Sequence, residues 1–281
     1  MPKYNARIWT ISSDRSCAIF TFQKYERPQT LDEAWELNQK RRNRIVGGMM
    51  WLKMSHRTHS TLIDLSDLGL DAFEEDEREF RIGAMVSLRQ LETHPGLNAY
   101  AHGAVRDALK DIVGVQFRNG ATLGGSLWRR MGFSDVLTVF MAMDSYVELH
   151  KGGVVPLDEF ARMQPDRDIL VRLIVRKQPG AFAYQAVRKQ RTDLPSLNCA
   201  AGKVGEQYRV AVGARPGRAM LVPDEQGILA GGITTESAQL FGQYAAQRLT
   251  VGSNMWGSAE YRRALVPVLV RRTLIALGEE L

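Results

Sequence analysis

The order of hydrophobic and polar positions predicts mixed helices and strands up to about residue 165. Thr30 to Glu33 has the form of a helix capping box, and the apolar positions that follow at helical spacing predict a helix over residues 31–42. The remaining predicted elements of this part are bounded by Gly, Pro, Ser or Asp residues: strands at 44–46, 61–65, 79–84 and 145–149, and helices at 99–112, 134–143 and 157–163.

The rest of the chain has a different order, in which strands come first and helices last. Four strands are predicted, at 168–176, 181–188, 196–201 and 207–212. An amphipathic helix is expected at 235–249, and Ser258 should cap a final helix that Pro267 would kink. Strands followed by helices are typical of an α+β domain and not of a doubly wound one.

The composition is that of an ordinary globular protein. The chain has 281 residues, of which 44% are hydrophobic and 24% charged, and this length suggests about two domains. The longest apolar run, Val136 to Met143, is too short to span a bilayer, and the first twenty residues carry charges in place of an apolar signal core. We therefore expect a soluble protein with no membrane span that is not exported.

Charge and cysteine content narrow the possible partners. The net charge is +6, but the basic residues come in short pairs such as Arg41-Arg42, which argues against a nucleic-acid surface. Cys17 and Cys199 form no Cys-x-x-Cys pair, so the chain cannot hold an iron–sulfur cluster or structural zinc on its own cysteines. A reducing cytoplasmic location is expected. No metal site is expected either, because His56 and His59 lack an accompanying carboxylate-rich helix.

Common enzyme motifs are absent from the sequence. It contains no Gly-x-Gly-x-x-Gly, no P-loop and no Gly-x-Ser-x-Gly, and no catalytic acid, base or nucleophile is identified. Two glycine pairs, Gly47-Gly48 and Gly124-Gly125, follow extended stretches. Adjacent glycines let main-chain N–H groups approach a diphosphate without a Cβ in the way. Glycine pairs also mark ordinary tight turns, so this signal is weak by itself.

Five ordered motifs change this picture. They are Tyr25 to Ala34, Ile45 to Gly48, Ile82 to Ala84, Arg118 to Leu127 and Ser258 to Leu265. In this order and spacing the chain resembles the FAD-binding medium subunit of the molybdenum hydroxylases, the xanthine dehydrogenase and carbon monoxide dehydrogenase family, over about residues 22–275.

The resemblance implies an α+β fold. A two-lobed FAD-binding domain of the molybdopterin dehydrogenase type would precede a C-terminal α+β domain of antiparallel strands plus helices. The expected boundaries are an N-terminal extension at 1–21, FAD-binding subdomains at 22–72 and 73–167, and a C-terminal flavoprotein domain at 168–281.

The resemblance also implies a function. The chain would be the flavoprotein subunit of a multisubunit molybdenum-dependent dehydrogenase or hydroxylase, with FAD as its own cofactor. A small subunit would carry two [2Fe–2S] clusters and a large subunit the molybdopterin. Electrons would pass from the clusters through FAD to an acceptor such as NAD or oxygen.

Site residues follow from the same resemblance. The first flavin loop would comprise Val46, Gly47, Gly48, Met49, Met50 and Trp51, and the second Thr122, Gly124, Gly125 and Ser126. The stretch Ile82, Gly83 and Ala84 would lie beside the isoalloxazine, or serve only in packing. Asp135 would contact the ribose or phosphate region, or complement the dipole of a helix N-terminus.

The loops also depart from the family pattern. Relatives usually have polar residues after the first glycine pair and Asn at the position of Ser126. Each lost hydrogen bond is worth about 0.5–1.5 kcal/mol, and about 3 when the acceptor is anionic, so affinity could fall ten- to a thousandfold. Arg129 or Arg130 could compensate by pairing with a phosphate, or be solvated. The alternative function is a degenerate scaffold or assembly subunit with weak or absent FAD binding, whose Trp-rich loops dock a partner.

Overall fold

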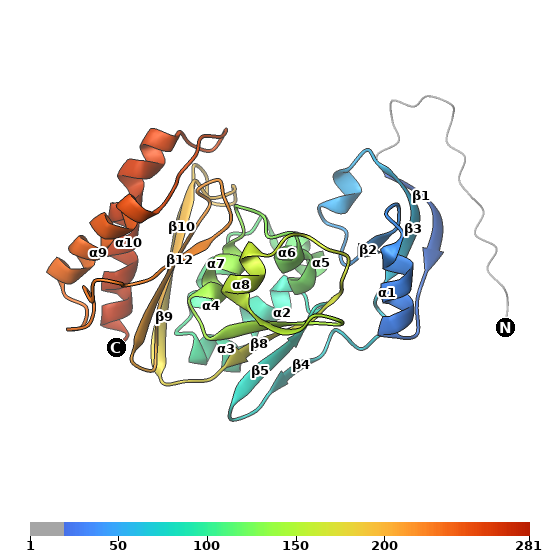
Figure 1. Ribbon diagram of the computed structural model, residues 1–281, viewed down its shortest axis with the longest axis horizontal. Helices are drawn as coiled ribbons and strands as arrows, with labels where there is room; N and C mark the ends of the chain where they lie inside the picture. The colour runs from blue at the N-terminus through green and yellow to red at the C-terminus, as the bar shows by residue number, and fades with distance from the viewer. Residues whose placement is uncertain (1–19) are drawn as a thin grey trace.

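The computed structural model describes residues 20–281, so nearly all of the predicted extension at 1–21 lies outside the described residues. Along the longest axis of the molecule the chain forms a small first lobe, a middle lobe and a C-terminal domain (Figure 1). The predicted α+β fold class is confirmed: helices are combined with a parallel sheet in the first lobe and antiparallel sheets in the other two parts.

The first lobe is a parallel sheet covered by one helix. Its strands, in the spatial order β1-β3-β2, are β1 (Thr21–Glu26), β2 (Arg44–Val46) and β3 (Thr58–Asp64). Helix α1 (Leu31–Gln39) begins as predicted, because the Thr30 hydroxyl accepts from the N–H of Glu33 at 3.1 Å. The helix ends earlier than the predicted residue 42, because Lys40 adopts an extended conformation with a ψ of 117°, and the Arg167 guanidinium binds its carbonyl at 2.7 Å.

The middle lobe contains a five-stranded antiparallel sheet and a set of short helices. The strand order is β4-β5-β8-β6-β7. The strands are β4 (Phe73–Glu75), β5 (Glu79–Gly83), β6 (Ser145–Leu149), β7 (Gly153–Pro156) and β8 (Leu170–Arg176). The helices are α2 (Leu88–Thr93), α3 (Pro95–Tyr100), α4 (Ala104–Leu109), α5 (Val115–Gly120), α6 (Leu123–Trp128), α7 (Asp135–Met141) and α8 (Leu157–Arg162).

Strand β8 belongs to this middle sheet, although the sequence analysis grouped it with the C-terminal domain. It pairs with β5 on one side and with β6 on the other, so it lies in the centre of the sheet. A boundary at residue 168 would remove the central strand. We propose instead that the middle lobe extends to about residue 177.

Two other predictions about the middle lobe were wrong. The single helix expected at 99–112 is broken into α3 and α4, because His102 and Gly103 both have positive φ angles, 50° and 77°. The second glycine pair, expected in a turn, lies in the first turn of α6, whose N-cap is Thr122. A capping threonine thus continues the chain into a helix where the glycines suggested a loop.

The C-terminal domain has strands followed by helices, as predicted. Its antiparallel strands, in the order β12-β11-β10-β9, are β9 (Gly180–Val187), β10 (Leu197–Val204), β11 (Gln207–Gly213) and β12 (Met220–Val222). Helices α9 (Thr235–Arg248) and α10 (Ala259–Glu279) pack together beside this sheet (Figure 1). Helix α10 continues through Pro267, whose carbonyl oxygen would lie 2.5 Å from a Cβ on Gly242, so the two helices approach closely there.

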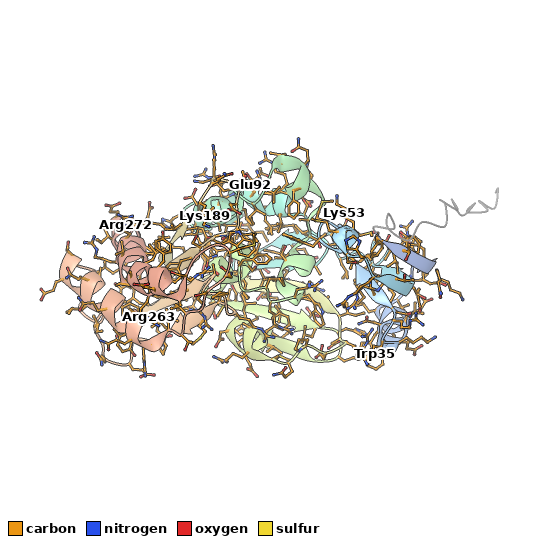
Figure 2. The ribbon with its side chains drawn as sticks, turned by 90° about the horizontal axis from the view of Figure 1, so that it is seen from above. Trp35, Lys53, Glu92, Lys189, Arg263 and Arg272 are labelled. Carbon is orange, nitrogen blue, oxygen red and sulfur yellow. The ribbon has the colours of Figure 1, made fainter. Side chains whose placement is uncertain are left out.

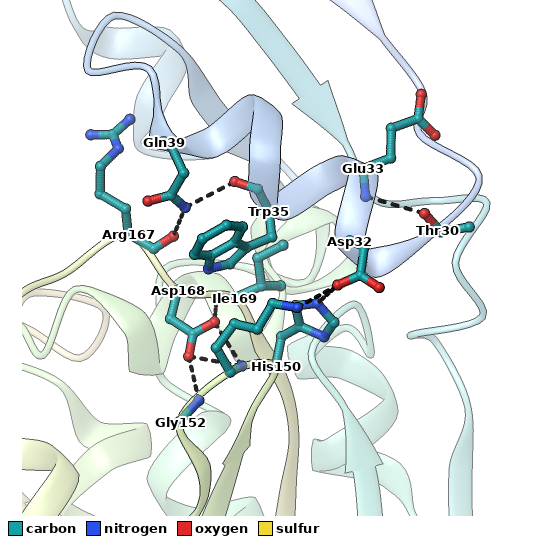
Figure 3. Close-up of polar contacts among 11 residues, drawn as sticks. Thr30, Asp32, Glu33, Trp35, Gln39, His150, Gly152, Arg167, Asp168 and Ile169 are labelled. Carbon is teal, nitrogen blue, oxygen red and sulfur yellow. Dashed lines mark hydrogen bonds and ion pairs between the residues drawn. The ribbon is translucent and has the colours of Figure 1, made fainter.

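Polar contacts join the first lobe to the middle lobe beside α1 (Figure 3). Asp32 on α1 pairs with His150 at 2.8 Å and also with Lys151. The side chains of Asn38 and Gln39 donate to the Arg167 carbonyl at 2.8 and 3.1 Å. These contacts therefore join the two lobes beside α1, independently of any contacts between the loops of the two lobes.

The thiol of Cys199 is completely buried in the C-terminal core. Burial raises its pKa to about 12 from an ordinary value of 9.0, so it stays protonated at neutral pH. We expect iodoacetamide at pH 8 to leave Cys199 unmodified in the folded chain and to modify it in urea, as mass spectrometry of a Cys17→Ser variant would reveal. Because the unfolded thiol ionises first, its contribution to stability should be lost as the pH rises from 9.0 toward 12. Rapid labelling of the folded variant would contradict this.

Candidate functional site

The two glycine pairs, from different lobes, meet through main-chain contacts. A Cβ on Gly48 would lie 1.3 Å from the carbonyl oxygen of Gly120, and one on Gly47 would lie 2.6 Å from the Thr122 hydroxyl. No side chain fits at the first of these positions. The loop after β2 therefore lies directly against the segment that joins α5 to α6, as the pairing of the two predicted loops requires.

The first loop presents free main-chain donors. Within residues 20–281, the N–H groups of Gly48, Met49, Met50 and Trp51 make no hydrogen bond. Met49 adopts a positive φ of 58°, which turns the chain between neighbouring amides. Successive unbonded amides on a bend are the arrangement that binds anions in main-chain nests.

The second loop is different, because the amides of its glycines already have acceptors. Gly124 donates to the Ala84 carbonyl at 2.7 Å, and Gly125 donates to the Thr122 hydroxyl at 3.2 Å. Gly124 is needed for close packing, since its Cβ would lie 2.8 Å from both Cβ and O of Ala84. Gly125 is exposed and Ser126 half-buried, so this turn of α6 still borders the surface. Free amides were expected in both loops, but only the first loop offers them.

The strand residues Ile82, Gly83 and Ala84 act in packing. Ile82 and Ala84 are buried in the core of the middle lobe. A Cβ on Gly83 would lie 2.0 Å from the Leu70 carbonyl oxygen. The Ala84 carbonyl holds the first turn of α6, so this strand end supports the second loop. The packing interpretation is the one that these contacts favour.

Asp135 is surrounded by partners within the chain. It is the first residue of α7 and is 5% exposed. Its carboxylate pairs with Arg188 at 2.9 Å, and it accepts from Asn198 at 2.9 Å and from the Tyr184 hydroxyl. Burial raises the pKa of Tyr184 well above its ordinary value, so this hydroxyl remains a donor. Asp135 thus joins the middle lobe to the C-terminal domain, and the predicted contact with a ribose or phosphate does not agree with this geometry.

Positive charge gathers where the first two lobes meet. Partial burial, together with the neighbouring cations Arg167, Arg129 and Arg57, lowers the pKa of Arg44. Arg167 donates only to carbonyl oxygens, those of Asn38, Lys40 and Asn43. Within residues 20–281 none of these four arginines forms an ion pair with a carboxylate. Arg44 is exposed, and a cation among like charges, with no carboxylate to neutralise it, favours the binding of an anion.

The two arginines proposed to compensate for lost loop contacts have different environments. Arg130 is 2% exposed, lies over the Phe160 ring at 3.8 Å and donates to the Phe160 carbonyl at 2.8 Å, so it is turned into the protein. Arg130 is therefore neither a partner for the phosphate nor a solvated surface residue. Arg129 is exposed and belongs to the cluster around Arg44.

An ion pair between two buried residues, which the sequence did not predict, positions the second loop. Arg118 on α5 donates to Glu92 at 2.7 and 3.2 Å and to the Ile112 carbonyl at 3.0 Å. This pair fixes α5, whose last residue is Gly120. Figure 2 shows Glu92 between Lys53, toward the first lobe, and Lys189, in the C-terminal domain. An arginine and a glutamate 26 positions apart carry no sequence signal of pairing.

A polar cavity of about 460 Å³ lies between α4 of the middle lobe and the segment that follows β9. Tyr184, Gln185 and Arg188 line it from the C-terminal side, together with Lys189. Lys110 and Asp111 line it from the other side. Asp135 therefore orients two of the residues that line this cavity.

Comparison with known families identifies proteins that share this arrangement. Residues 20–177, more than half of the chain, match the model of the FAD binding domain in molybdopterin dehydrogenase. The chain belongs to that family. Residues 182–277 match a second model, the CO dehydrogenase flavoprotein C-terminal domain.

Individual relatives of this FAD-binding family span nearly the whole chain. The medium subunit of nicotine 6-hydroxylase from Paenarthrobacter nicotinovorans is 26% identical, over 91% of this chain and 97% of its own length. The putative xanthine dehydrogenase FAD-binding subunit XdhB of Escherichia coli K12 is 24% identical, over 91% and 96%. Among solved structures, carbon monoxide dehydrogenase from Hydrogenophaga pseudoflava has the same fold, with a TM-score of 0.82 at 23% identity over 92% of this chain and 97% of that one.

Among the predicted contacts with the FAD of this family, those to its diphosphate agree best with the described residues. The predicted side-chain contacts agree less well. Unbonded amides and unneutralised arginines both suit a dianionic group. Among residues 20–281 there is no group of three His, Cys, Asp or Glu side chains that could hold a metal ion. In the same range no helix is long and apolar enough to cross a membrane.

Proposed function

We propose that this chain is the FAD-binding, electron-transfer subunit of a molybdenum hydroxylase-type oxidoreductase. The observation that carries the proposal is the row of free amides from Gly48 to Trp51, beside the arginines around Arg44, where two lobes meet. Main-chain donors and arginines would hold the diphosphate of FAD, and the glycines let the first loop lie against the middle lobe. No acid or base from the chain is required.

When bound, FAD supplies the capacity to take up and release electrons, and the protein supplies binding and electrostatics. We propose that the cavity beside Arg188 admits the flavin ring, whose environment Asp135 sets through Arg188 and Tyr184. The first loop thus provides affinity and the cavity provides the redox environment.

The remainder of the electron path lies on partner subunits. In our proposal a small subunit with [2Fe–2S] clusters delivers electrons, a large subunit carries molybdopterin, and the acceptor is NAD or oxygen, in the cytoplasm. The medium subunit of nicotine 6-hydroxylase, similar over 91% of this chain, supports such a division of labour.

A second candidate function is that of a scaffold subunit with little or no FAD binding. Two observations favour it. The amides of Gly124 and Gly125 are engaged within the chain, and Met49 and Met50 offer no side-chain hydrogen bond to a phosphate. The two functions differ in one measurable property, the affinity for FAD.

Thermal unfolding with added FAD distinguishes the two functions. At a concentration one hundred times the dissociation constant, FAD should stabilise the chain by about 2.7 kcal/mol and raise the melting temperature by about 5 °C. Riboflavin, which lacks the diphosphate, should have a much smaller effect. No shift at millimolar FAD would support the scaffold.

Replacing Arg129 by glutamine should lower the affinity for FAD about tenfold to a hundredfold, because a charge-assisted bond to phosphate is worth about 1.5–3 kcal/mol. Raising the salt concentration should weaken binding to the wild-type chain more than to the variant. Isothermal titration measures both effects. Arg162→Gln is the control, since Arg162 is 71% exposed and pairs with Asp158 on α8. Equal affinities for all three proteins would remove Arg129 from the site.

A further inference from the structure

Two apolar side chains of the first loop bind it to the middle lobe. The ring of Trp51 lies 6.1 Å from that of Phe117 on α5 and 5.7 Å from that of Phe133, which precedes α7. The methyl group of Met50 rests on Gly120, 2.5 Å from where a Cβ would be. Both contacts cross from the first lobe to the middle lobe.

These side chains belong to the residues whose amides are free. The side chain of Met50 offers no hydrogen bond to a ligand, and that of Trp51 offers at most one, from its indole N–H. Their side chains nevertheless contact the middle lobe on both sides of the second loop, at residue 117 before it and residue 133 after it. This anchors the loop at two points.

An anchored loop binds a ligand more tightly than a mobile one. If only a fraction of molecules hold the amides in the binding arrangement, the apparent dissociation constant rises by the inverse of that fraction. A loop without side-chain contacts would have to be ordered during binding, at a cost in entropy. The two aromatic contacts of Trp51 and the contact of Met50 order the loop when the chain folds. The cost in entropy then no longer falls on ligand binding.

We propose that Trp51 and Met50 form an apolar clamp that holds the first-loop amides in position before a diphosphate binds. Trp51 is then a positioning residue that acts through the amides of Gly48 to Trp51. The clamp rests on the proposed function and deepens it. Preorganised amides would supply the affinity for FAD that polar side chains in the first loop do not provide.

The test uses the full chain and two ligands, FAD and inorganic pyrophosphate. In Trp51→Ala the dissociation constants of both should rise about tenfold to a hundredfold, and Trp51→Phe should restore most of the affinity. Phe133→Ala removes a partner of the clamp and should weaken both ligands similarly. Met54→Ala is the control, because Met54 is 64% exposed on the neighbouring helix η1 (Leu52–Met54).

Pyrophosphate separates positioning from direct contact, since it has no ring for an indole to stack on. Weaker FAD binding in Trp51→Ala with unchanged pyrophosphate binding would overturn the clamp in favour of stacking. Unchanged binding of both ligands would also overturn it.

Hydrogen exchange of the Lys53 amide, which donates to the Met49 carbonyl of the first loop at 3.0 Å, tests the clamp in the free chain without any ligand. Exchange should be faster in Trp51→Ala than in Met54→Ala, and equal rates would contradict the clamp. This measurement stands even if the wild-type chain fails to bind FAD, which would refute the proposed function alone.

Discussion

Replacing Gly48 by alanine is expected to raise the dissociation constant for FAD at least about a hundredfold. The new methyl group would lie 1.3 Å from the Gly120 carbonyl oxygen, so the first loop must move away from the middle lobe. Inserting a methyl group into such a contact costs about 1–3 kcal/mol, and displacement of the free amides removes the diphosphate donors themselves. Fluorescence titration with FAD measures the loss.

Two other glycines provide matched controls. Among the described residues, a Cβ on Gly231 would meet nothing within 4 Å, so Gly231→Ala should leave FAD binding unchanged. Of the atoms in residues 20–281, a Cβ on the exposed Gly125 would meet only the Thr122 hydroxyl, at 3.1 Å, so Gly125→Ala should weaken binding far less than Gly48→Ala. If the three variants bound FAD equally well, the first loop would not be the diphosphate site.

Replacing Asp135 by asparagine is expected to lower the free energy of unfolding by about 3–5 kcal/mol. The change leaves Arg188 buried without its carboxylate, and the loss of one partner from a buried pair has a cost of this size. The amide oxygen of the new side chain would still accept from Tyr184 and Asn198, so the loss isolates the ion pair. Urea unfolding with a probe in each domain would measure it.

Asp67→Asn is the control for this prediction. Asp67 pairs with Arg27 at the surface, where the two side chains are 35% and 48% exposed, and such pairs contribute about 0–1 kcal/mol. If Asp135→Asn cost no more than Asp67→Asn, the buried cluster would not join the middle lobe to the C-terminal domain.

Local signals in the sequence predicted much of the fold. The capping box at Thr30 and the alternating strand at residues 145–149 depend on neighbouring residues, and both are present in the structure. The break at His102 and Gly103 was missed because the apolar spacing continues across it. The central position of β8 was missed because its partners β5 and β6 are distant in the sequence.

The candidate site was predictable only in part. The resemblance selected the first loop, and the structure brings that loop against Gly120. It could not reveal that Ala84 and Thr122 occupy the amides of Gly124 and Gly125, or that Arg188 faces Asp135. These contacts form between residues 40 and 53 positions apart or within one helix turn, where the residue types alone allow several partners. The roles of Arg129 and Trp51 depend on the same tertiary contacts.

A crystal structure of the chain saturated with FAD is the most direct test of how the cofactor is held. Diphosphate oxygens are expected about 2.7–3.2 Å from the N–H groups of Gly48 to Trp51, with Trp51 still against Phe117 and Phe133. A diphosphate bound elsewhere, or a first loop whose amides face away from it, would show that these amides do not hold the cofactor.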